Sequence, residues 1–465
     1  MRKLHDEKEQ AIVKERKAAM RVSVITSLMT AFMGSALNLS IPHMGDYFGA
    51  SATTVSWIIT GYMLSIASMS VPFGKLADTT GRRRIFLMGI MGFTLSCGLA
   101  TVAWEIWFIL ILRVIQGISA AMIFATNTAI LLSIFPPGER GKVLGNLTAG
   151  VYVGLSAGPV IGGMLNHYLG WQSIFLVSCV MGTVALIIAF RHLPKQEKLE
   201  VEKKHDVLGN ILYIAMILCV MVGFSGISTV KYSWVLLILG AMLTGAFVLV
   251  ELRATNPVIQ VRIFRKNPVY TLSNLTALMN YSATFAIGYL GSLYLQLIMG
   301  YTSRAAGLIL IAQPVVMAIL SPVAGRWSDR IAPYKLASLG MVFCAVGLVI
   351  FAFVGAHWPL WVIVMALLVT GMGFALFSSP NTNAVMSCVK RENYGIASSI
   401  LTTMRSLGQS SGMAVVTLIM GFSMKNTPLS EAPPEVLLET MHIGFFVFTG
   451  LCIAGIFMSL KRNAG

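Results

Sequence analysis

Apolar runs of about twenty residues recur from one end of this 465-residue chain to the other. Each run is long enough to cross a hydrocarbon layer roughly 30 Å thick as an α-helix. A helix satisfies its own backbone hydrogen bonds in the bilayer, where no water does so. The chain is also 56% apolar and only 11% charged. These features predict an all-α, polytopic membrane protein and exclude the soluble classes.

Charged breaks divide the apolar runs into fourteen predicted spans. These spans cover residues 22–42, 54–73, 85–103, 107–132, 143–165, 172–190, 207–227, 234–252, 270–297, 304–324, 335–355, 358–386, 396–421 and 441–460. The first residues lack the apolar core and cleavage site of a signal peptide. With both termini in the cytoplasm, most of the 34 Lys and Arg residues fall on the inner side, as the positive-inside rule requires. The prediction is a multi-pass protein of the cytoplasmic membrane.

The longest charged insert between spans is RHLPKQEKLEVEKKHD at 191–206, which predicts a cytoplasmic linker between two helix bundles. The predicted organisation is a cytoplasmic N-terminal segment at 1–21, a six-helix bundle at 22–190, the linker at 191–206, an inserted helix pair at 207–252, a cytoplasmic loop at 253–269, a second six-helix bundle at 270–460 and a cytoplasmic tail at 461–465.

The stretch GKLADTTGRRR, Gly74 to Arg84, carries one aspartate and four cationic side chains. A related pattern follows 251 residues later, because PFGKLAD at 72–78 is matched by PVAGRWSDR at 322–330, each with glycine four residues before aspartate. Internal duplication on this scale is typical of transporters built from structural repeats.

The residue types of this motif predict a clasp between two helices. Gly74 and Gly81 permit a tight turn and close backbone approach, and Asp78 is suited to accept hydrogen bonds from a helix N-terminus or to pair with Arg82. An ordinary positive-inside loop is the alternative, but it explains neither the glycine and aspartate spacing nor the second copy. The predicted conformational motif comprises Gly74, Asp78, Gly81, Arg82, Arg83, Gly325, Asp329 and Arg330.

GKLADTTGRRR resembles the loop signature of the major facilitator superfamily. LRVIQGISAA at 112–121 resembles the family's fourth-helix arginine motif, and GVYVGLSAGPVIGG at 150–163 resembles its fifth-helix antiporter motif. NPVIQVRIF at 256–264 resembles the segment that follows the two extra helices of fourteen-helix drug:proton antiporters. The resemblance implies the major facilitator fold, with fourteen transmembrane helices in two six-helix bundles plus two inserted helices, and multidrug efflux by antiport.

Four glycines of the fifth-helix motif recur every four residues, so they share one helix face and allow a neighbouring backbone to approach closely. Pro159 predicts a kink. Tight packing is one interpretation; that the contact also biases the direction of exchange is implied by the resemblance alone. The predicted antiporter helix motif comprises Gly150, Gly154, Gly158, Pro159, Gly162 and Gly163.

Charged groups inside the spans are few. Arg113 lies in an apolar run, where a cation needs a partner or a water-lined cavity, and both a structural role and direct proton or substrate handling stay open. Arg405 is predicted to snorkel toward the cytoplasm. The resemblance implies an aspartate nine residues before Pro42, but that position is Met33. The coupling candidates are therefore Arg113, Glu105 and Asp46, with Asp78 as a further possibility.

The predicted substrate cavity is lined by neutral polar and aromatic side chains, which suit neutral, zwitterionic or anionic amphiphiles better than dications. Each of these side chains is alternatively a bond to a neighbouring helix. The candidates are Asn38, Tyr62, Asn127, Asn280, Tyr281 and Gln313.

The sequence thus favours a secondary transporter that exports lipophilic small molecules or drugs by alternating access in exchange for protons. Alternatives are a carrier of anionic or neutral metabolites without coupling, and a non-transporting sensor or scaffold.

No nucleophile–base pair, metal-ligand cluster or phosphate-binding loop is evident, so no enzyme activity, metal or cofactor is expected. The expected partners are a small-molecule substrate, protons and the lipid bilayer, with a monomeric protein. The +16 net charge reports membrane orientation and does not indicate nucleic acid.

Overall fold

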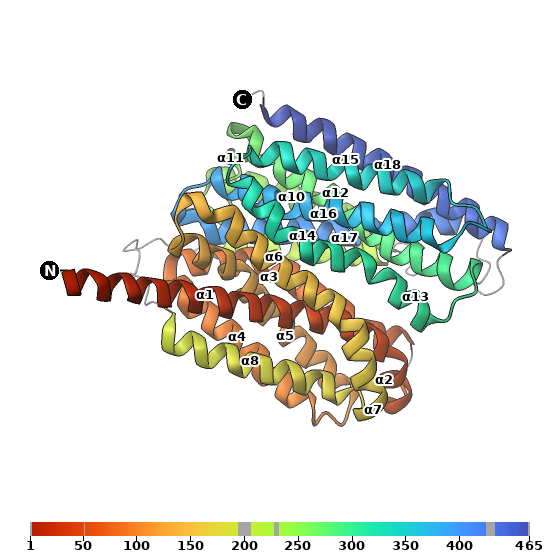
Figure 1. The fold of residues 1–465 in the computed structure, drawn as a ribbon, viewed down its shortest axis with the longest axis horizontal. Coiled ribbons are helices and arrows are strands. Elements are labelled where there is room, and N and C mark those ends of the chain that lie inside the picture. Colours follow the sequence, from red (N-terminus) through yellow and green to blue (C-terminus); the bar gives the residue numbers. More distant parts are fainter. Residues whose placement is uncertain (1, 51, 194–205, 227–231, 425–432, 464–465) are drawn as a thin grey trace. The chain divides into compact units, whose positions relative to one another are not determined.

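The computed structural model describes residues 2–50, 52–193, 206–226, 232–424 and 433–463, and every regular element in these ranges is a helix (Figure 1). The chain forms two compact units. Unit 1 comprises residues 1–205 and 389–402, and unit 2 comprises residues 206–388 and 403–465. Unit 1 is therefore discontinuous in sequence, since it includes a segment that follows most of unit 2.

Unit 1 is built mainly from the first eight α-helices. They are α1 (Arg2–Ala36), α2 (Ile41–Phe48), α3 (Ala52–Thr80), α4 (Arg82–Ala100), α5 (Ile106–Ile134), α6 (Arg140–Ala157), α7 (Gly163–Leu169) and α8 (Gln172–His192), with the short turns η1 (Leu37–Ser40), η2 (Pro137–Glu139), η3 (Gly158–Gly162) and η5 (Arg391–Asn393). Its apolar core contains Met33, which is fully buried.

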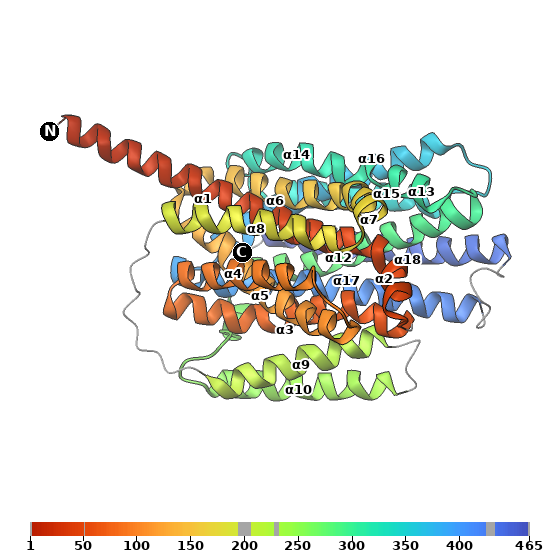
Figure 2. The ribbon, with the colours of Figure 1, turned by 90° about the horizontal axis from the view of Figure 1, so that it is seen from below.

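Unit 2 contains the remaining helices, including the pair α9 and α10, which run side by side in Figure 2. They are α9 (Val207–Ser225), α10 (Ser233–Arg253), α11 (Arg262–Lys266), α12 (Pro268–Leu293), α13 (Ser303–Leu310), α14 (Ala312–Ser328), α15 (Pro333–Ala352), α16 (Leu360–Ser387) and α18 (Pro434–Leu460), with the turns η4 (Tyr294–Ile298) and η6 (Lys461–Asn463). The helix α17 (Tyr394–Met424) begins in unit 1 and continues into unit 2.

Twelve helical segments among the described residues are long and apolar enough to cross a membrane. The other two predicted spans correspond to α12 and α17, which have 26 and 31 residues. Both are long enough to cross, but hydroxyl and amide side chains, such as Ser398, Thr402 and Gln409 of α17, make them more polar. Such side chains are tolerated in a membrane where they contact protein instead of lipid.

The predicted spans differ from the helices mainly at their ends. The first helix starts at Arg2, twenty residues before the predicted span. The predicted span 143–165 consists of α6 and α7 joined by η3, a π-helical turn that contains Pro159. Proline has no backbone N–H to donate, so the regular hydrogen-bond pattern is interrupted there. The span 304–324 is divided between α13 and α14.

Equivalent contacts recur in the two units, as expected for an internal duplication. In unit 1, Asn127 of α5 donates a hydrogen bond to the Ser23 carbonyl oxygen of α1 at 3.2 Å. In unit 2, Asn381 of α16 donates to the Ser273 carbonyl oxygen of α12 at 3.1 Å. Both asparagines are buried. The same amide therefore joins the same pair of helices in each repeat.

Candidate functional site

Asp78, near the end of α3, is the centre of a buried polar cluster in unit 1. Its carboxylate accepts a hydrogen bond from Arg82 Nε at 2.8 Å. It also accepts bonds from the backbone N–H groups of Gly395 at 3.1 Å and Ile396 at 3.0 Å, at the start of α17. These N–H groups have no partner within their own helix, and the helix dipole favours a negative charge there. Asp78 thus makes both of the contacts that its sequence context predicts, and we refer to these four residues as the clasp.

Three glycines make this arrangement sterically possible. Gly81 has a φ of 112°, a conformation that other residues rarely adopt, and forms the turn between α3 and α4. A β-carbon on Gly74 would lie 2.8 Å from the Gly395 carbonyl oxygen, and one on Gly395 would lie 2.6 Å from Asp78 Oδ1. Side chains at either position would separate α3 from α17.

Further contacts hold the start of α17 within unit 1. The Arg82 guanidinium donates to the Arg391 carbonyl oxygen and lies over the Tyr394 ring at 5.8 Å. Arg140, the first residue of α6, donates to the Tyr394 hydroxyl at 2.5 Å. By contrast, Arg83 donates to the Leu193 carbonyl oxygen at 3.0 Å, so it caps the end of α8 and is not part of the clasp.

The second motif copy has a different environment in unit 2. Gly325 is buried in α14, Asp329 is half-buried at the end of that helix, and Arg330 is exposed. The neighbouring Ser328 hydroxyl accepts a hydrogen bond from Asn383 of α16 at 3.1 Å. Pro333 stands where the first copy has Arg82. The copies therefore share their glycine and aspartate spacing but not the Arg82 guanidinium.

The glycine face of α6 packs directly against the α1 backbone. A β-carbon on Gly154 would lie 2.5 Å from the Leu28 carbonyl oxygen, and one on Gly162 would lie 2.5 Å from Ala36 Cβ. Gly150 and Gly158 lie on the same face, next to Val24 and Ser35, while Gly163 begins α7 after the π-helical turn at Pro159. This close approach is the packing that the four-residue spacing predicts.

The two arginines inside predicted spans have different surroundings. Arg113 is 1% exposed, donates to the Ile58 carbonyl oxygen at 2.7 Å and to Gln116 Oε1 at 2.8 Å, and lies over the Tyr62 ring at 4.2 Å. Arg405 lies over the Tyr281 ring at 4.6 Å. Arg113 thus joins α5 to α3, and Arg405 packs on an aromatic ring.

The carboxylates proposed for coupling lie at helix ends. Asp46 in α2 and Glu105 before α5 are both exposed, whereas Asp78 is 9% exposed. The Asp78 carboxylate and the Arg82 guanidinium form a salt bridge at 2.8 Å. Asp78 is therefore the buried member of this group of candidates.

The predicted cavity residues mostly bond to neighbouring helices within their own unit. Gln313 donates to Thr370 Oγ1 at 3.3 Å, Asn280 lies 3.7 Å from Cys344 Sγ, and the Tyr281 hydroxyl lies 3.1 Å from Ser378 Oγ. Asn127 bonds to α1, and Tyr62 lies beneath Arg113. The side chain of Asn38 lies outside the described residues. The predicted set thus belongs largely to helix–helix contacts.

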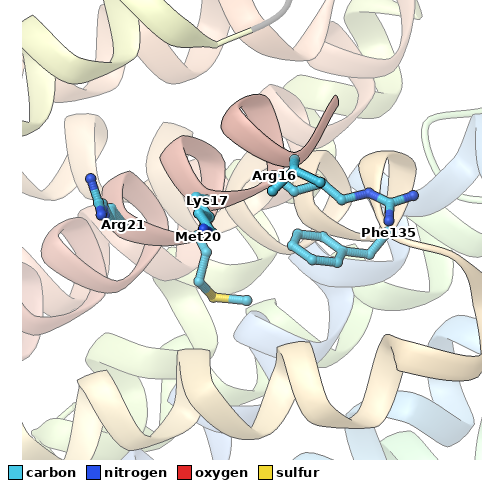
Figure 3. A pocket seen from close by; sticks show the side chains of 6 residues that line it. Arg16, Lys17, Met20, Arg21 and Phe135 are labelled. Carbon is cyan, nitrogen blue, oxygen red and sulfur yellow. The ribbon is translucent and has the colours of Figure 1, made fainter. Parts of the chain in front are cut away.

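A pocket of about 340 Å³ lies beside the N-terminal half of α1. Figure 3 shows the basic and apolar side chains around it. They are Val13, Arg16, Lys17, Met20, Arg21 and Phe135. None of the predicted cavity residues lines it, so this pocket is distinct from the predicted substrate cavity.

Arg462 lies in the segment predicted as a tail, and its burial is not evident from the sequence. It is 3% exposed and donates to Asn381 Oδ1 at 2.9 Å and to the hydroxyl of Thr276. Burial lowers the pKa of the Arg462 guanidinium to about 10, so it remains charged at neutral pH. It joins η6 to α12 and α16. Helix α9 also has an unpredicted contact, because its Tyr213 hydroxyl lies 2.7 Å from Thr403 Oγ1 of α17.

Comparison with known families agrees with this architecture. The family model described as Major Facilitator Superfamily matches residues 23–413 and, in a second match, residues 272–461. The chain belongs to this superfamily. It is therefore a multi-pass membrane transporter of a small-molecule substrate and not an enzyme. The double match to one family agrees with the repeated contacts of the two units.

Several relatives cover nearly the whole chain at low identity. The riboflavin transporter RibZ of Clostridioides difficile is 26% identical over 96% of this chain and 98% of its own. The multidrug resistance protein Stp of Mycobacterium tuberculosis is 29% identical over 86% of this chain and 75% of its own. The solved human organic anion transporter MFSD10 (TETRAN) shares the fold, with a TM-score of 0.69 at 15% identity over 96% of this chain and 99% of that one.

Proposed function

We propose that this protein exports lipophilic small molecules across the cytoplasmic membrane by alternating access, in exchange for protons. The observation that carries the proposal is the clasp, in which Asp78 binds the first N–H groups of α17. Contacts of this kind hold one conformation and open in another. Multidrug resistance proteins among the relatives and the glycine face of α6 support export.

The proposed topology has fourteen transmembrane helices with both termini in the cytoplasm. Twelve helices meet the criteria of length and hydropathy, and α12 and α17 complete the set because each is long enough to span the bilayer. The pair α9 and α10 is then the insertion between two six-helix bundles. The charged segment 191–206 and the loop 253–269 lie on the cytoplasmic side, in agreement with their excess of basic residues.

Asp78 is the coupling group that we favour over Glu105 and Asp46, since those two are exposed. Protonation of the Asp78 carboxylate would remove its charge and weaken the ion pair with Arg82 and both hydrogen bonds to α17. The start of α17 would then be released. Arg113 takes no part in this step, because its donors already bind Ile58 and Gln116.

A second candidate is a carrier of anionic or neutral metabolites without proton coupling. Its support is the absence of the first-helix acid: Met33, at that position, is fully buried in the apolar core of unit 1. A methionine carries neither a proton nor a charge for pairing with a cationic substrate. The relationship to a riboflavin transporter is compatible with this alternative.

Transport by proteoliposomes with inverted orientation distinguishes the candidates. A fluorescent lipophilic cation and a fluorescent lipophilic anion are each supplied with and without an inside-acid pH gradient. Proton-coupled export predicts accumulation of at least one probe that depends on the gradient. Movement that is indifferent to the gradient would support the uncoupled carrier, and no movement of either probe would contradict both.

The clasp is tested with Asp78→Asn, and Asp329→Asn in the second motif copy serves as the matched control. The asparagine keeps the size of the side chain but removes its charge, so we expect gradient-driven transport to fall at least about tenfold. The control is expected to retain most activity. Equal activity of Asp78→Asn and the unchanged protein would exclude the clasp as the coupling element.

A further inference from the structure

We propose that Arg405 and Tyr281 form an anion-binding pair in unit 2 that gives the transporter a preference for anionic amphiphiles. The inference names a substrate class for the proposed export function and so rests on that function. It depends on the position of Arg405 in its helix, on its lack of an oxygen partner and on the absence of nearby carboxylates.

Arg405 is placed well inside a long helix. It is the twelfth residue of α17, about 16 Å along the axis from Tyr394 at a rise of about 1.5 Å per residue. A cation at the centre of a bilayer costs on the order of 2.5–3.5 kcal/mol on insertion scales unless a partner or water stabilises it. An arginine at this position therefore needs an interaction that offsets this cost.

The protein supplies Arg405 with an aromatic ring but with no anion. The guanidinium lies over the Tyr281 ring at 4.6 Å, and the ring is fixed by the contact of its hydroxyl with Ser378 Oγ at 3.1 Å. Among the described residues, no carboxylate, carbonyl or amide oxygen accepts a hydrogen bond from Arg405, and its Nε is buried without a partner. Its charge and its donors are thus left for a ligand.

Arg113 in unit 1 provides an internal comparison. It also lies over a tyrosine ring, that of Tyr62, but its donors bind the Ile58 carbonyl oxygen and Gln116 Oε1. This is the usual way in which a buried arginine is satisfied. Arg405 has the same aromatic support without the oxygen acceptors, which distinguishes a ligand-binding arginine from a structural one.

The helices that carry Arg405, Tyr281 and Ser378 lack acidic side chains. The sequences of α12, α16 and α17 include no aspartate or glutamate. A cationic ligand would be repelled, whereas a carboxylate, sulfonate or phosphate would accept charge-assisted hydrogen bonds from the guanidinium fork. The adjacent Tyr281 ring favours a ligand that also has an aromatic or apolar part. The ligand class is therefore an anionic amphiphile.

The test measures equilibrium binding to the purified full-length protein in lipid nanodiscs, so it requires no transport. Three probes share a naphthalene ring and differ in charge: 2-naphthylacetate, its neutral amide and 2-naphthylethylammonium. We expect the carboxylate to bind roughly ten- to a hundredfold more tightly than the amide, the range of charge-assisted hydrogen bonds, and the ammonium compound to bind most weakly.

Substitutions test whether Arg405 and Tyr281 cause the preference for the carboxylate probe. Arg405→Gln should bind the carboxylate and the amide equally, because the charge that distinguishes them is removed, and retained binding of the amide shows that the variant is folded. Tyr281→Phe keeps the ring and should retain the preference, whereas Tyr281→Leu should reduce it. Arg326→Gln, at an exposed arginine of α14, is the matched control and should behave like the unchanged protein.

A wild-type protein that shows no preference for the carboxylate, or a preference that survives in Arg405→Gln, would overturn the inference. Either result leaves proton-coupled export intact, because the proteoliposome assay tests that function separately. Conversely, anion binding could depend on Arg405 while the protein transports no probe. That result would support the anion-binding pair and contradict the transport proposal.

Discussion

At the scale of single residues, the buried arginines of this protein differ in the groups that accept their hydrogen bonds. Arg113 and Arg462 each donate to oxygen atoms of other helices, and Arg82 pairs with Asp78. A buried donor that is satisfied in this way contributes to stability, and its removal leaves the acceptors without partners. Arg462 is the case in which this effect is most easily separated from the clasp, because it belongs to unit 2 whereas the clasp belongs to unit 1.

Arg462→Gln is expected to destabilise unit 2. The change leaves Asn381 Oδ1 and the Thr276 hydroxyl without a charged donor, at a cost of about 2–4 kcal/mol. Thermal unfolding followed with a maleimide dye measures this loss of stability. Cys344 and Cys452 are buried in the folded protein, so the dye reacts with them when the protein unfolds. Lys461→Gln, at an exposed neighbour, is the control and should leave the melting temperature unchanged. Equal melting temperatures for both variants would contradict the structural role.

At the scale of elements, glycines determine how closely neighbouring helices pack. Gly154 brings α6 against the Leu28 carbonyl of α1, and Gly408 brings α17 against the Leu278 carbonyl of α12 in the same way. These are matching contacts in the two repeats. A side chain at either position requires the two helix backbones to separate, and close backbone packing is a main source of helix association in membranes.

Alanine substitutions are expected to have opposite effects at different glycines. Gly154→Ala and Gly408→Ala should each lower the melting temperature, because the new methyl group would overlap a carbonyl of the facing helix. Gly421→Ala, in α17 with no atom within 4 Å of the added methyl group, should leave stability unchanged or raise it by roughly 0.5–1 kcal/mol. A loss of stability of the same size at all three positions would show that packing is not the cause.

At the scale of the whole molecule, the sequence predicts the existence and order of the long apolar helices, because the length of an apolar run depends only on local composition; among the described residues, twelve are long and apolar enough to cross a membrane. It also predicts the duplication and the acceptor role of Asp78. It does not identify Gly395 and Ile396 as the donors, nor the burial of Arg462, because these partners are chosen by tertiary packing between distant segments. For the same reason, the sequence does not distinguish amides that face a ligand from amides that join helices.

The fourteen-helix topology predicts which connections lie on opposite sides of the membrane. In a background without native cysteines, Lys266→Cys and Thr302→Cys flank α12, and Lys390→Cys and Pro433→Cys flank α17; all four positions are exposed. A membrane-impermeant maleimide added to intact cells should label the cysteines at 302 and 433 but not those at 266 and 390. Labelling of both members of a pair would show that the helix between them does not cross.

The discontinuity of unit 1 also has a consequence for biosynthesis. Asp78 cannot form its hydrogen bond with Gly395 until that residue, 317 residues further along the chain, has been synthesised. At about 5–20 residues per second, the ribosome needs roughly 15–60 s to deliver that partner. During this interval the nascent unit 1 is inserted but incomplete, with an exposed carboxylate where α17 will dock. Its final folding step therefore follows the synthesis of most of unit 2, and a protein truncated before Tyr394 would remain a target for quality-control proteases.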